Sequence, residues 1–290
     1  MKKLFALILV ACLLIPEAVL AEAPSLPLDL SAGMPLRQSC YLDKNTYEDP
    51  TIRMEVTTGR AFDTPYWRAD VTIGHPTQLR TMPARSFDSS ARIQGKQLSL
   101  RANAVLAIDG DYYWIDAERR GRCVLRQGTL YSKRLIGKSD ILTIDEDGNF
   151  RIAVKAQEED VAEEIGGKRI YNALCFGPAL IVDGAVCRIE PDEYVASEKP
   201  RARIALCQKG PLQYTVVCCG GPSARSKGMT LQEFADTLGE MALLQAYNLD
   251  GGNSAMMFTG GRMINVNSSI RSLSDIVYFA SAWDGGETAK

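Results

Sequence analysis

The sequence predicts an α+β fold: a strand-rich single domain with a mixed or antiparallel sheet, many hairpins and a few packed helices. Three observations indicate this class. Short apolar and β-branched runs alternate with turn residues along most of the chain. One segment after residue 230 repeats its apolar residues at helical spacing. No Gly/Ser-rich linker separates the residues before 98 from the remainder of the chain, so residues 39–284 are predicted to form one domain.

The chain begins with the pattern of a secretory signal. Two lysines precede an apolar run over residues 4–14, and Ala21-Glu22-Ala23 supplies the small residues at which a signal is cleaved. We therefore expect residues 1–21 to be a signal peptide, residues 22–38 to be a Pro-rich leader, and the protein to be secreted or otherwise extracytoplasmic. A lipoprotein signal that acylates Cys12 is the alternative. No other stretch approaches about 18 consecutive apolar residues, so no transmembrane span is expected in the mature chain.

Strands and hairpins are predicted along most of the chain up to residue 219. Turn pairs such as Asp147-Gly148 and Asp183-Gly184 lie between alternating apolar runs, which is the pattern of a β-hairpin. The predicted strands are 52–56, 69–73 and 98–108, and the predicted hairpins are 123–131, 141–154, 179–189 and 204–219. The acidic stretch 157–164 is predicted to be a solvated helix.

A packed helix is predicted to begin at Leu231. Thr230 and Glu233 have the spacing of a capping box. The apolar residues after them recur at helical spacing until the helix ends within residues 239–243. The last predicted elements are a short buried strand and the two strands of a hairpin, over residues 244–249, 255–258 and 263–266.

The composition excludes some classes of partner. The formal net charge is −2, from 33 basic and 35 acidic residues, and this balance gives no electrostatic footprint for nucleic acid. The sequence has one histidine, His75, and no Cys-x-x-Cys pair, so it lacks the ligand pattern of a Cys2His2 zinc site. We expect neither a metal nor a cofactor.

The cysteines are predicted to be mostly buried thiols. Export would permit disulfides, but seven cysteines remain when Cys12 is set aside, and an odd number leaves at least one unpaired. Cys175 with Cys187, and Cys207 with Cys218, lie on neighbouring predicted hairpin strands, so a bond within either pair is geometrically conceivable. We favour buried thiols, because a free cysteine packs as a small hydrophobic side chain.

The most informative stretch is Asn248-Leu249-Asp250-Gly251-Gly252-Asn253-Ser254-Ala255-Met256, where a predicted strand ends in a carboxylate followed by two glycines. Paired glycines permit positive φ and let a ligand approach the main chain closely. Consecutive N–H groups in such a turn can converge on an anion. The turn therefore predicts an anion site with Asp250 at its rim.

Five blocks of sequence, in this order, resemble those of the phosphodiester glycosidase family. The blocks are Ala107-Ile108-Asp109-Gly110-Asp111-Tyr112-Tyr113, Lys199-Pro200-Arg201-Ala202-Arg203-Ile204, Lys227-Gly228-Met229-Thr230-Leu231, Asn248-Leu249-Asp250-Gly251-Gly252-Asn253-Ser254 and Arg271-Ser272-Leu273-Ser274-Asp275. The resemblance covers residues 101–282, and five ordered blocks are more specific than any one of them. This chain departs from the family pattern at Asp109 (usually Asn), Asn253 (usually Gly), Ser272 (usually Pro) and Arg203 (usually small).

The resemblance implies an exported hydrolase that cleaves the glycosidic C–O bond of a sugar-1-phosphodiester, of the N-acetylglucosamine type or in a cell-wall or exopolysaccharide glycan. The leaving group is a phosphate monoester, so the site needs anion stabilisation together with a carboxylate on the sugar side. The residues assigned to catalysis are Asp250 and Asp109. The residues assigned to substrate or phosphate binding are Arg201, Arg271, Gly251, Gly252, Asn248 and Ser254.

Other interpretations stay open at this point. The chain could be a non-catalytic carbohydrate- or phosphate-binding module of the same fold, or a metal-dependent phosphodiesterase. Asp250 could simply cap its turn, Asp111 could serve in place of Asp109, and Arg271 could pair with Asp275 on the surface. Asn248 and Ser254 could bond sugar hydroxyls or merely satisfy backbone groups. The aromatic run Tyr112-Tyr113-Trp114 could stack on a sugar or belong to the core.

Overall fold

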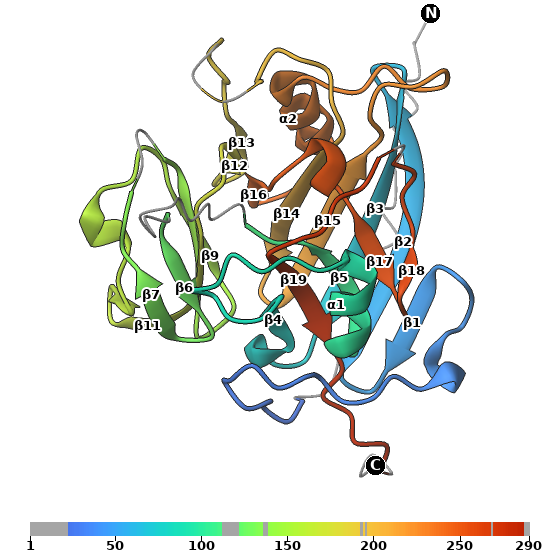
Figure 1. Cartoon of the computed structure of the whole chain (residues 1–290), viewed down its shortest axis with the longest axis vertical. Helices are drawn as coiled ribbons and strands as arrows, with labels where there is room; N and C mark the ends of the chain where they lie inside the picture. Colours follow the sequence, from blue (N-terminus) through green and yellow to red (C-terminus); the bar gives the residue numbers. More distant parts are fainter. Residues whose placement is uncertain are drawn as a thin grey trace, which may run out of the picture.

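A computed structural model describes residues 23–111, 122–135, 139–191, 194, 196–267 and 269–286. The predicted signal peptide, Cys12 and the aromatic run at 112–114 lie outside the described residues. Within these residues the chain forms three sheets, two of which face each other while the third lies to one side (Figure 1).

The largest sheet has eight strands. In spatial order they are β1 (Thr46–Asp49), β2 (Ile52–Ala61), β3 (Thr64–Ile73), β15 (Gln213–Cys219), β14 (Arg203–Gly210), β16 (Gln245–Asn248), β12 (Ala179–Val182) and β13 (Ala185–Val186). The central strands β14, β15 and β16 are almost wholly buried, because both faces of the sheet are covered.

The other two sheets are smaller. The five-stranded sheet runs β18 (Arg262–Met263), β17 (Met257–Thr259), β5 (Ala104–Asp109), β19 (Asp275–Ala280) and β4 (Leu79–Pro83). The side sheet runs β7 (Thr129–Ser132), β6 (Val124–Arg126), β11 (Lys168–Leu174), β8 (Ile141–Asp145) and β9 (Phe150–Ala153), and β10 (Glu164–Ile165) pairs with β11. Figure 1 shows the side sheet in green, beside the two facing sheets.

The fold is more strand-dominated than the α+β class that the sequence predicts. Every strand pairing among the described residues is antiparallel. The α-helices of these residues are α1 (Gly95–Arg101) and α2 (Leu231–Gly239), with single 3-10 turns at Gln38–Cys40, Pro76–Gln78, Glu158–Asp160 and Gly252–Ser254. None of the described helices is long and apolar enough to cross a bilayer.

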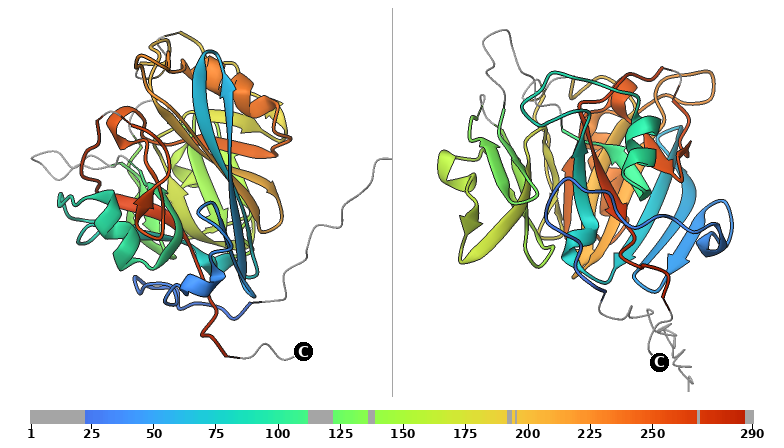
Figure 2. Two further views of the ribbon diagram at one scale, coloured as in Figure 1. Left: turned by 90° about the vertical axis from the view of Figure 1, so that its right-hand side faces the viewer. Right: turned by 60° about the horizontal axis from the view of Figure 1, so that its bottom comes forward.

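The main core lies between the eight-stranded and five-stranded sheets. Its buried side chains come from both sheets, for example Val71, Val216, Val105 and Phe279, and strands β8 and β9 of the side sheet add to it. On the far face of the eight-stranded sheet α2 packs its apolar stripe, and on the far face of the five-stranded sheet α1 does the same. The order of layers is therefore α2, eight-stranded sheet, five-stranded sheet and α1, as the turned views of Figure 2 show.

The helix signals in the sequence are confirmed for α2. It begins at Leu231, the Thr230 hydroxyl accepts a hydrogen bond from the Glu233 N–H, and the Glu233 carboxylate accepts one from the Thr230 N–H. The Asp-Gly hairpins at residues 147–148 and 183–184 are also present. The strand predicted over 98–108 is wrong in its first half, where α1 buries Leu98 before β5 begins. The acidic stretch 157–164 is not a solvated helix: it forms the 3-10 turn named above, and its last residue begins β10.

Residues 23–37, which the sequence predicts to be part of a leader, pack on the domain. Ala23 and Leu26 are buried in the core beneath α1 and β19. The Arg80 guanidinium donates to the carbonyls of Asp29 and Ser31, at 3.0 and 3.2 Å. This segment lies at the bottom of Figure 1, near the C-terminus.

The seven described cysteines are free thiols, which confirms the interpretation as apolar side chains. Six are buried and Cys187 is partly exposed. Burial raises the pKa of Cys123 to about 12, so this thiol stays protonated.

Candidate active site

The candidate site lies where several strands end. Asp109 is the last residue of β5 and Asp275 is the first residue of β19. Because the two strands are antiparallel neighbours, with Asp109 opposite Ile276, both acids lie at the same end of the strand pair. Asn248 is the last residue of β16, so the glycine turn leaves the eight-stranded sheet there. The site is thus formed between the two facing sheets.

Backbone contacts draw the predicted sequence blocks together. Arg201 and Met229 exchange two N–H to carbonyl bonds, both 3.0 Å. The Gly252 N–H donates to the Ala202 carbonyl at 2.8 Å, and the Arg271 N–H donates to the Asn253 carbonyl at 3.2 Å. Four of the five blocks are therefore joined to one another by backbone contacts, and Asp109 and Asp111 of the fifth line the same cleft as Asp250.

Asp250, Ser254 and Arg271 form one connected group. The Ser254 hydroxyl donates to Asp250 Oδ2 at 2.8 Å, and the Arg271 guanidinium donates to both partners through Nη2 and Nε. The Asp250 side chain is 15% exposed and that of Arg271 39%, so the ion pair closes the site at its solvent side. The carboxylate predicted to be catalytic is thus held by a guanidinium and a hydroxyl.

The two glycines are required by the close packing of the backbone rather than by a bound anion. A Cβ on Gly251 would lie 2.7 Å from the Ala202 carbonyl oxygen, too close for any side chain, and Gly252 has φ of +58°. The prediction that the Gly252 N–H is an anion donor needs correction, because that N–H is already bonded to the Ala202 carbonyl. The close approach of this turn to the segment at Ala202 is what requires glycine.

Arg201 lies at the rim of the same turn. Its side chain is exposed, and its Nη1 lies 3.9 Å from the position of a Cβ built on Gly252. The neighbouring Arg203, a departure from the family pattern, is buried and donates to the carbonyls of Ala196, Lys199 and Met229 at 2.8 to 3.1 Å. Burial lowers the pKa of Arg203 to about 10, still well above neutrality. Arg203 therefore braces the segment that carries Arg201.

Asn248 satisfies the backbone with one end of its amide. Its Nδ2 donates to the Gly177 carbonyl at 2.7 Å, and its own N–H donates to the Pro178 carbonyl at 3.0 Å. The buried Oδ1 has no hydrogen-bond partner among the described residues. Of the two roles that the sequence left open for Asn248, the structure displays the backbone contact.

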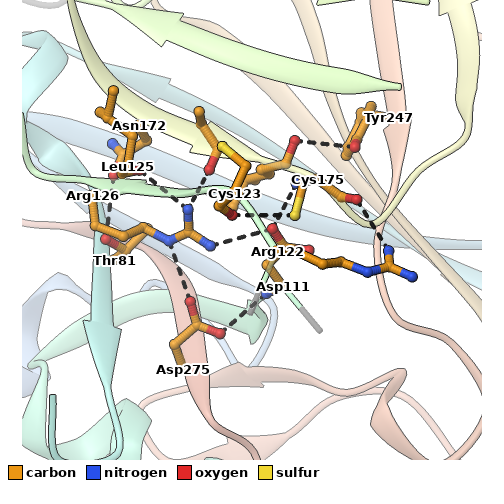
Figure 3. A network of polar contacts seen from close by, with 12 residues as sticks. Thr81, Asp111, Arg122, Cys123, Leu125, Arg126, Asn172, Cys175, Tyr247 and Asp275 are labelled. Carbon is orange, nitrogen blue, oxygen red and sulfur yellow. Dashed lines mark hydrogen bonds and ion pairs between the residues drawn. The ribbon is translucent and has the colours of Figure 1, made fainter. Parts of the chain in front are cut away.

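Behind the glycine turn lies a cluster of buried charges that the sequence does not reveal. Asp111 and Asp275 accept from the guanidinium of Arg126, each at 3.4 Å, and all three side chains are at most 1% exposed (Figure 3). Arg126 also donates to the Leu125 and Ala173 carbonyls, while Asp111 accepts from the Cys175 N–H at 2.6 Å. The Asp275 carboxylate further accepts from the Asp111 N–H at 3.1 Å, which fixes the turn that carries Asp109.

The pKa values of Asp275 and Asp109 are raised in and beside this cluster. Burial raises the pKa of Asp275 to about 7, against the opposing effect of Arg126. Burial, followed by the charge of Asp275, raises the pKa of Asp109 well above its usual range, although Arg271 opposes the shift. Asp109 Oδ2 and Asp111 Oδ1 are buried and have no hydrogen-bond partner among the described residues. The raised pKa favours the protonated form of Asp109.

A narrow cleft joins these groups. Its lining residues are Arg92, Asp109, Asp111, Asp250, Ser254, Arg271, Ser272, Leu273 and Ser274. The cleft volume is about 10 Å³, which is room for roughly one water molecule. The ion pair between Arg271 and Asp250 narrows this cleft, whose volume is below that of typical ligand sites.

The structure brings most of the predicted site residues together. Asp250, Ser254, Arg271 and Asp109 line one cleft, and Arg201 stands at the rim of the glycine turn. The surface pair of Arg271 with Asp275 is not formed, because Asp275 is buried against Arg126. The sequence gives little indication that Arg126 is a buried charge. Arg126 follows two apolar residues directly, but the adjacent Gln127-Gly128 predicts a hairpin turn at this position.

The described residues contain no group of three His, Cys, Asp or Glu side chains arranged to hold a metal ion. Arg126 is paired with the buried Asp111 and Asp275, and Arg271 is paired with Asp250 at the solvent side. Arg271 and Asp109, whose pKa is raised, line the same cleft, and a cation beside a carboxyl of this kind is compatible with an anionic ligand.

The fold thus brings carboxylates and arginines together in one cleft and in the buried cluster next to it. The family model for phosphodiester glycosidases matches residues 102–280, and the chain belongs to that family. No match to this chain was found among curated proteins.

Solved structures share the fold. The zebrafish N-acetylglucosamine-1-phosphodiester alpha-N-acetylglucosaminidase catalytic domain, auto-inhibited by its pro-peptide, superposes with a TM-score of 0.66 at 13% identity, covering 86% of this chain and 87% of that one. A hypothetical protein from Synechocystis has a TM-score of 0.56 at 13% identity, covering 79% of this chain and 62% of the other. A protein from Burkholderia pseudomallei K96243 has a TM-score of 0.54 at 13% identity, with coverages of 75% and 74%. At this identity the likeness shows the fold alone.

Proposed function

We propose that this protein is an exported glycosidase that cleaves the C–O bond between a sugar and the phosphate of a sugar-1-phosphodiester, releasing free sugar and a phosphate monoester. The observation that supports it most is the meeting of Asp250, Arg271 and Asp109 in one cleft. Export is supported by the secretory signal pattern of residues 1–21. The substrate is a glycan or smaller sugar phosphodiester, such as one of N-acetylglucosamine.

The chemistry follows from the charges of the cleft. In this proposal Arg271 and Arg201 hold the phosphate oxygens, because a guanidinium binds an anion through two parallel donors. When Arg271 turns to the phosphate it releases Asp250 Oδ2, and the carboxylate is then charged and facing the sugar. Asp250 acts as the nucleophile or base, and its carboxylate stabilises the positive charge that develops on the anomeric carbon.

Asp109 supplies the complementary group. Its pKa is raised by burial and by the charge of Asp275, and this shift favours the protonated form. A neutral acid at this position donates a hydrogen bond to an oxygen of the departing phosphate, which needs stabilisation more than full protonation because its second pKa is about 6. Asp109, where the family usually has Asn, thus keeps a donor in place.

A test of the bond that breaks uses water labelled with heavy oxygen. The mature chain from residue 22 is incubated with the methyl phosphodiester of N-acetylglucosamine in the presence of EDTA. The masses of the two products are then measured by mass spectrometry. Cleavage of the C–O bond places the label in the sugar. Label in the phosphate, or loss of activity with EDTA, would instead indicate a metal-dependent phosphodiesterase.

The role of Asp250 is tested with one substitution and a matched control. Asp250→Asn is expected to lower kcat by at least about a hundredfold, the lower end of what a positioned acid or base contributes. Asp236→Asn makes the same change on the exposed side of α2 and should leave kcat unaltered. An unchanged rate for Asp250→Asn would remove this carboxylate from the mechanism.

A second candidate function is binding without catalysis. The departures from the family pattern at Asp109 and Asn253 favour it, because Asp109 is one of the two residues assigned to catalysis. Tight binding of the same diester to the unaltered protein, with no product after long incubation, would establish this alternative.

A further inference from the structure

The loop of residues 84–93 connects β4 to α1, and both of its ends are attached to the segment that precedes β19. The Ala84 N–H donates to the Ser274 carbonyl at 2.6 Å. Ile93 and Leu273 exchange two N–H to carbonyl bonds, of 3.1 and 2.8 Å, as an antiparallel bridge. In Figure 1 this loop, in teal, runs from β4 toward β6 and back to α1. Both ends of the loop are thus fixed beside the start of β19.

The middle of the loop contacts the buried charge cluster. Phe87 is 2% exposed and packs with Val124 of β6, and its ring centroid lies 5.4 Å from that of Tyr131. The guanidinium carbon of Arg126 lies over the Phe87 ring, 5.6 Å from its centroid, which is within the range of a cation–π contact. Because the loop is attached at both ends and in its middle, a side chain that it carries starts from a fixed backbone position.

Arg92 is the residue of this loop that lines the candidate site. The antiparallel bridge described above places Arg92 opposite Ser274. Arg92 and Ser274 both line the cleft, together with Asp109 and Asp250. Arg92 is exposed, whereas the guanidinium of Arg126 is fully buried, so a ligand that enters the cleft from solvent can reach Arg92.

A phosphate in the cleft requires more positive charge than Arg271 alone supplies. Among the described residues that line the cleft, the cations are Arg92 and Arg271. Arg271 is paired with Asp250, so its charge is already balanced by that carboxylate. A phosphodiester adds a further negative charge, and the monoester that leaves carries about −1.5 to −2 at neutral pH. Arg92 is the lining residue that supplies the compensating charge.

We propose that Arg92 is a further phosphate-binding residue, which holds the phosphate of the substrate together with Arg271. The inference rests on the proposed function, because that function places a phosphate in the cleft. The loop of residues 84–93 lies outside residues 102–280, which the family model matches, so Arg92 belongs to a part of the chain that the family assignment does not cover. The negative charge on the phosphate grows as the monoester departs, so Arg92 stabilises the transition state more than the bound substrate.

Substitutions of Arg92 test this role on the methyl phosphodiester of N-acetylglucosamine. Arg92→Gln is expected to lower kcat/KM by at least about tenfold, or about 1.4 kcal/mol. Arg92→Lys keeps the charge without the two parallel donors and should fall between the two. Arg85→Gln removes an exposed arginine of the same loop that lines a different cavity, so it is the control and should leave kcat/KM unaltered. An unchanged kcat/KM for Arg92→Gln would overturn the proposal.

Two inhibitors separate phosphate binding from a structural disturbance of the cleft. Methyl phosphate carries the anion alone, and free N-acetylglucosamine carries the sugar alone. Arg92→Gln should raise the inhibition constant of methyl phosphate by at least about tenfold and leave that of the sugar unchanged. The thermal unfolding midpoint should also be unchanged, because Arg92 is exposed. An equal rise of both inhibition constants would show a general effect on the cleft and contradict the proposal.

Direct binding of methyl phosphate distinguishes failure of this inference from failure of the proposed function. If the unaltered protein does not cleave the diester, calorimetry with methyl phosphate still measures the contribution of Arg92. Binding that is at least about tenfold weaker in Arg92→Gln, at unchanged thermal stability, would support the phosphate contact without catalysis. Equal binding by Arg92→Gln and the unaltered protein, or no binding by the unaltered protein, would overturn it.

Discussion

The buried acid cluster predicts that the stability of the protein depends on pH through Asp275. The pKa of Asp275 is about 7 in the folded protein and 3.8 for an ordinary Asp, as in the unfolded chain. The folded state therefore holds a proton that the unfolded state releases. For a raised pKa the contribution to stability is fully present below about pH 4 and is lost as the pH rises through about 7.

The magnitude follows from the interval between the two pKa values. About three pH units at about 1.4 kcal/mol each give about 4 kcal/mol of unfolding free energy that is lost between acidic and weakly alkaline pH. Between about pH 5 and 6.5, one extra proton in the folded state gives a slope of about −1.4 kcal/mol per pH unit. Asp109, whose pKa is raised in the same direction, steepens this slope.

Asp275→Asn is expected to remove the Asp275 part of this dependence. An amide does not ionise, so the unfolding free energy of the variant should fall less steeply, by up to about 1.4 kcal/mol per pH unit. Urea unfolding followed by tryptophan fluorescence at several pH values between about 4.5 and 8 gives the two slopes. The exposed Asp236→Asn should run parallel to the unaltered protein.

Two outcomes would refute the reasoning. Identical slopes for Asp275→Asn and the unaltered protein would show that Asp275 does not change its proton on folding. A variant that is much less stable than the unaltered protein at about pH 5, where Asp275 should be protonated, would show that Asp275 is charged in the folded protein and that Arg126 depends on that charge.

Two further predictions concern the interior. Arg126→Met should destabilise the protein by about 3 to 5 kcal/mol, because it leaves Asp111 and Asp275 buried without a counter-charge; urea midpoints measure this, and a loss below about 1 kcal/mol would contradict the ion cluster. In the native protein iodoacetamide should modify Cys187 and spare the six buried thiols, because burial raises the pKa of thiols such as Cys123 and covers their sulfurs. Mass spectrometry counts the added groups before and after unfolding, and rapid native labelling of several thiols would be the contrary result.

Local signals in the sequence are sufficient for many elements. The start of α2 is predictable because Thr230 and Glu233 satisfy each other within four residues, and hairpin turns are predictable because Asp-Gly pairs favour them. The strand predicted over 98–108 is wrong in its first half, since a short apolar run fits a buried helix and a buried strand equally well. Its helix is decided by packing of Leu98 against the five-stranded sheet.

The candidate site is partly predictable for a similar reason. Asp250, Arg271 and Asp109 lie in ordered blocks, so their meeting could be expected from the resemblance. Long-range pairing could not be predicted from the sequence, because Asp275 and Arg126 are 149 positions apart in the chain. The use of the Gly252 N–H by the Ala202 carbonyl was equally invisible, because it depends on how closely two loops approach.

For protein engineering, the Arg126 contacts mean that the side sheet is not a removable appendage. Its strand β6 carries Arg126, and the acids that this arginine neutralises belong to the five-stranded sheet and to the turn after β5. A shortened chain that kept only the two facing sheets would leave those acids without their guanidinium. Any minimal version of this scaffold must retain β6 or replace both acids with neutral side chains.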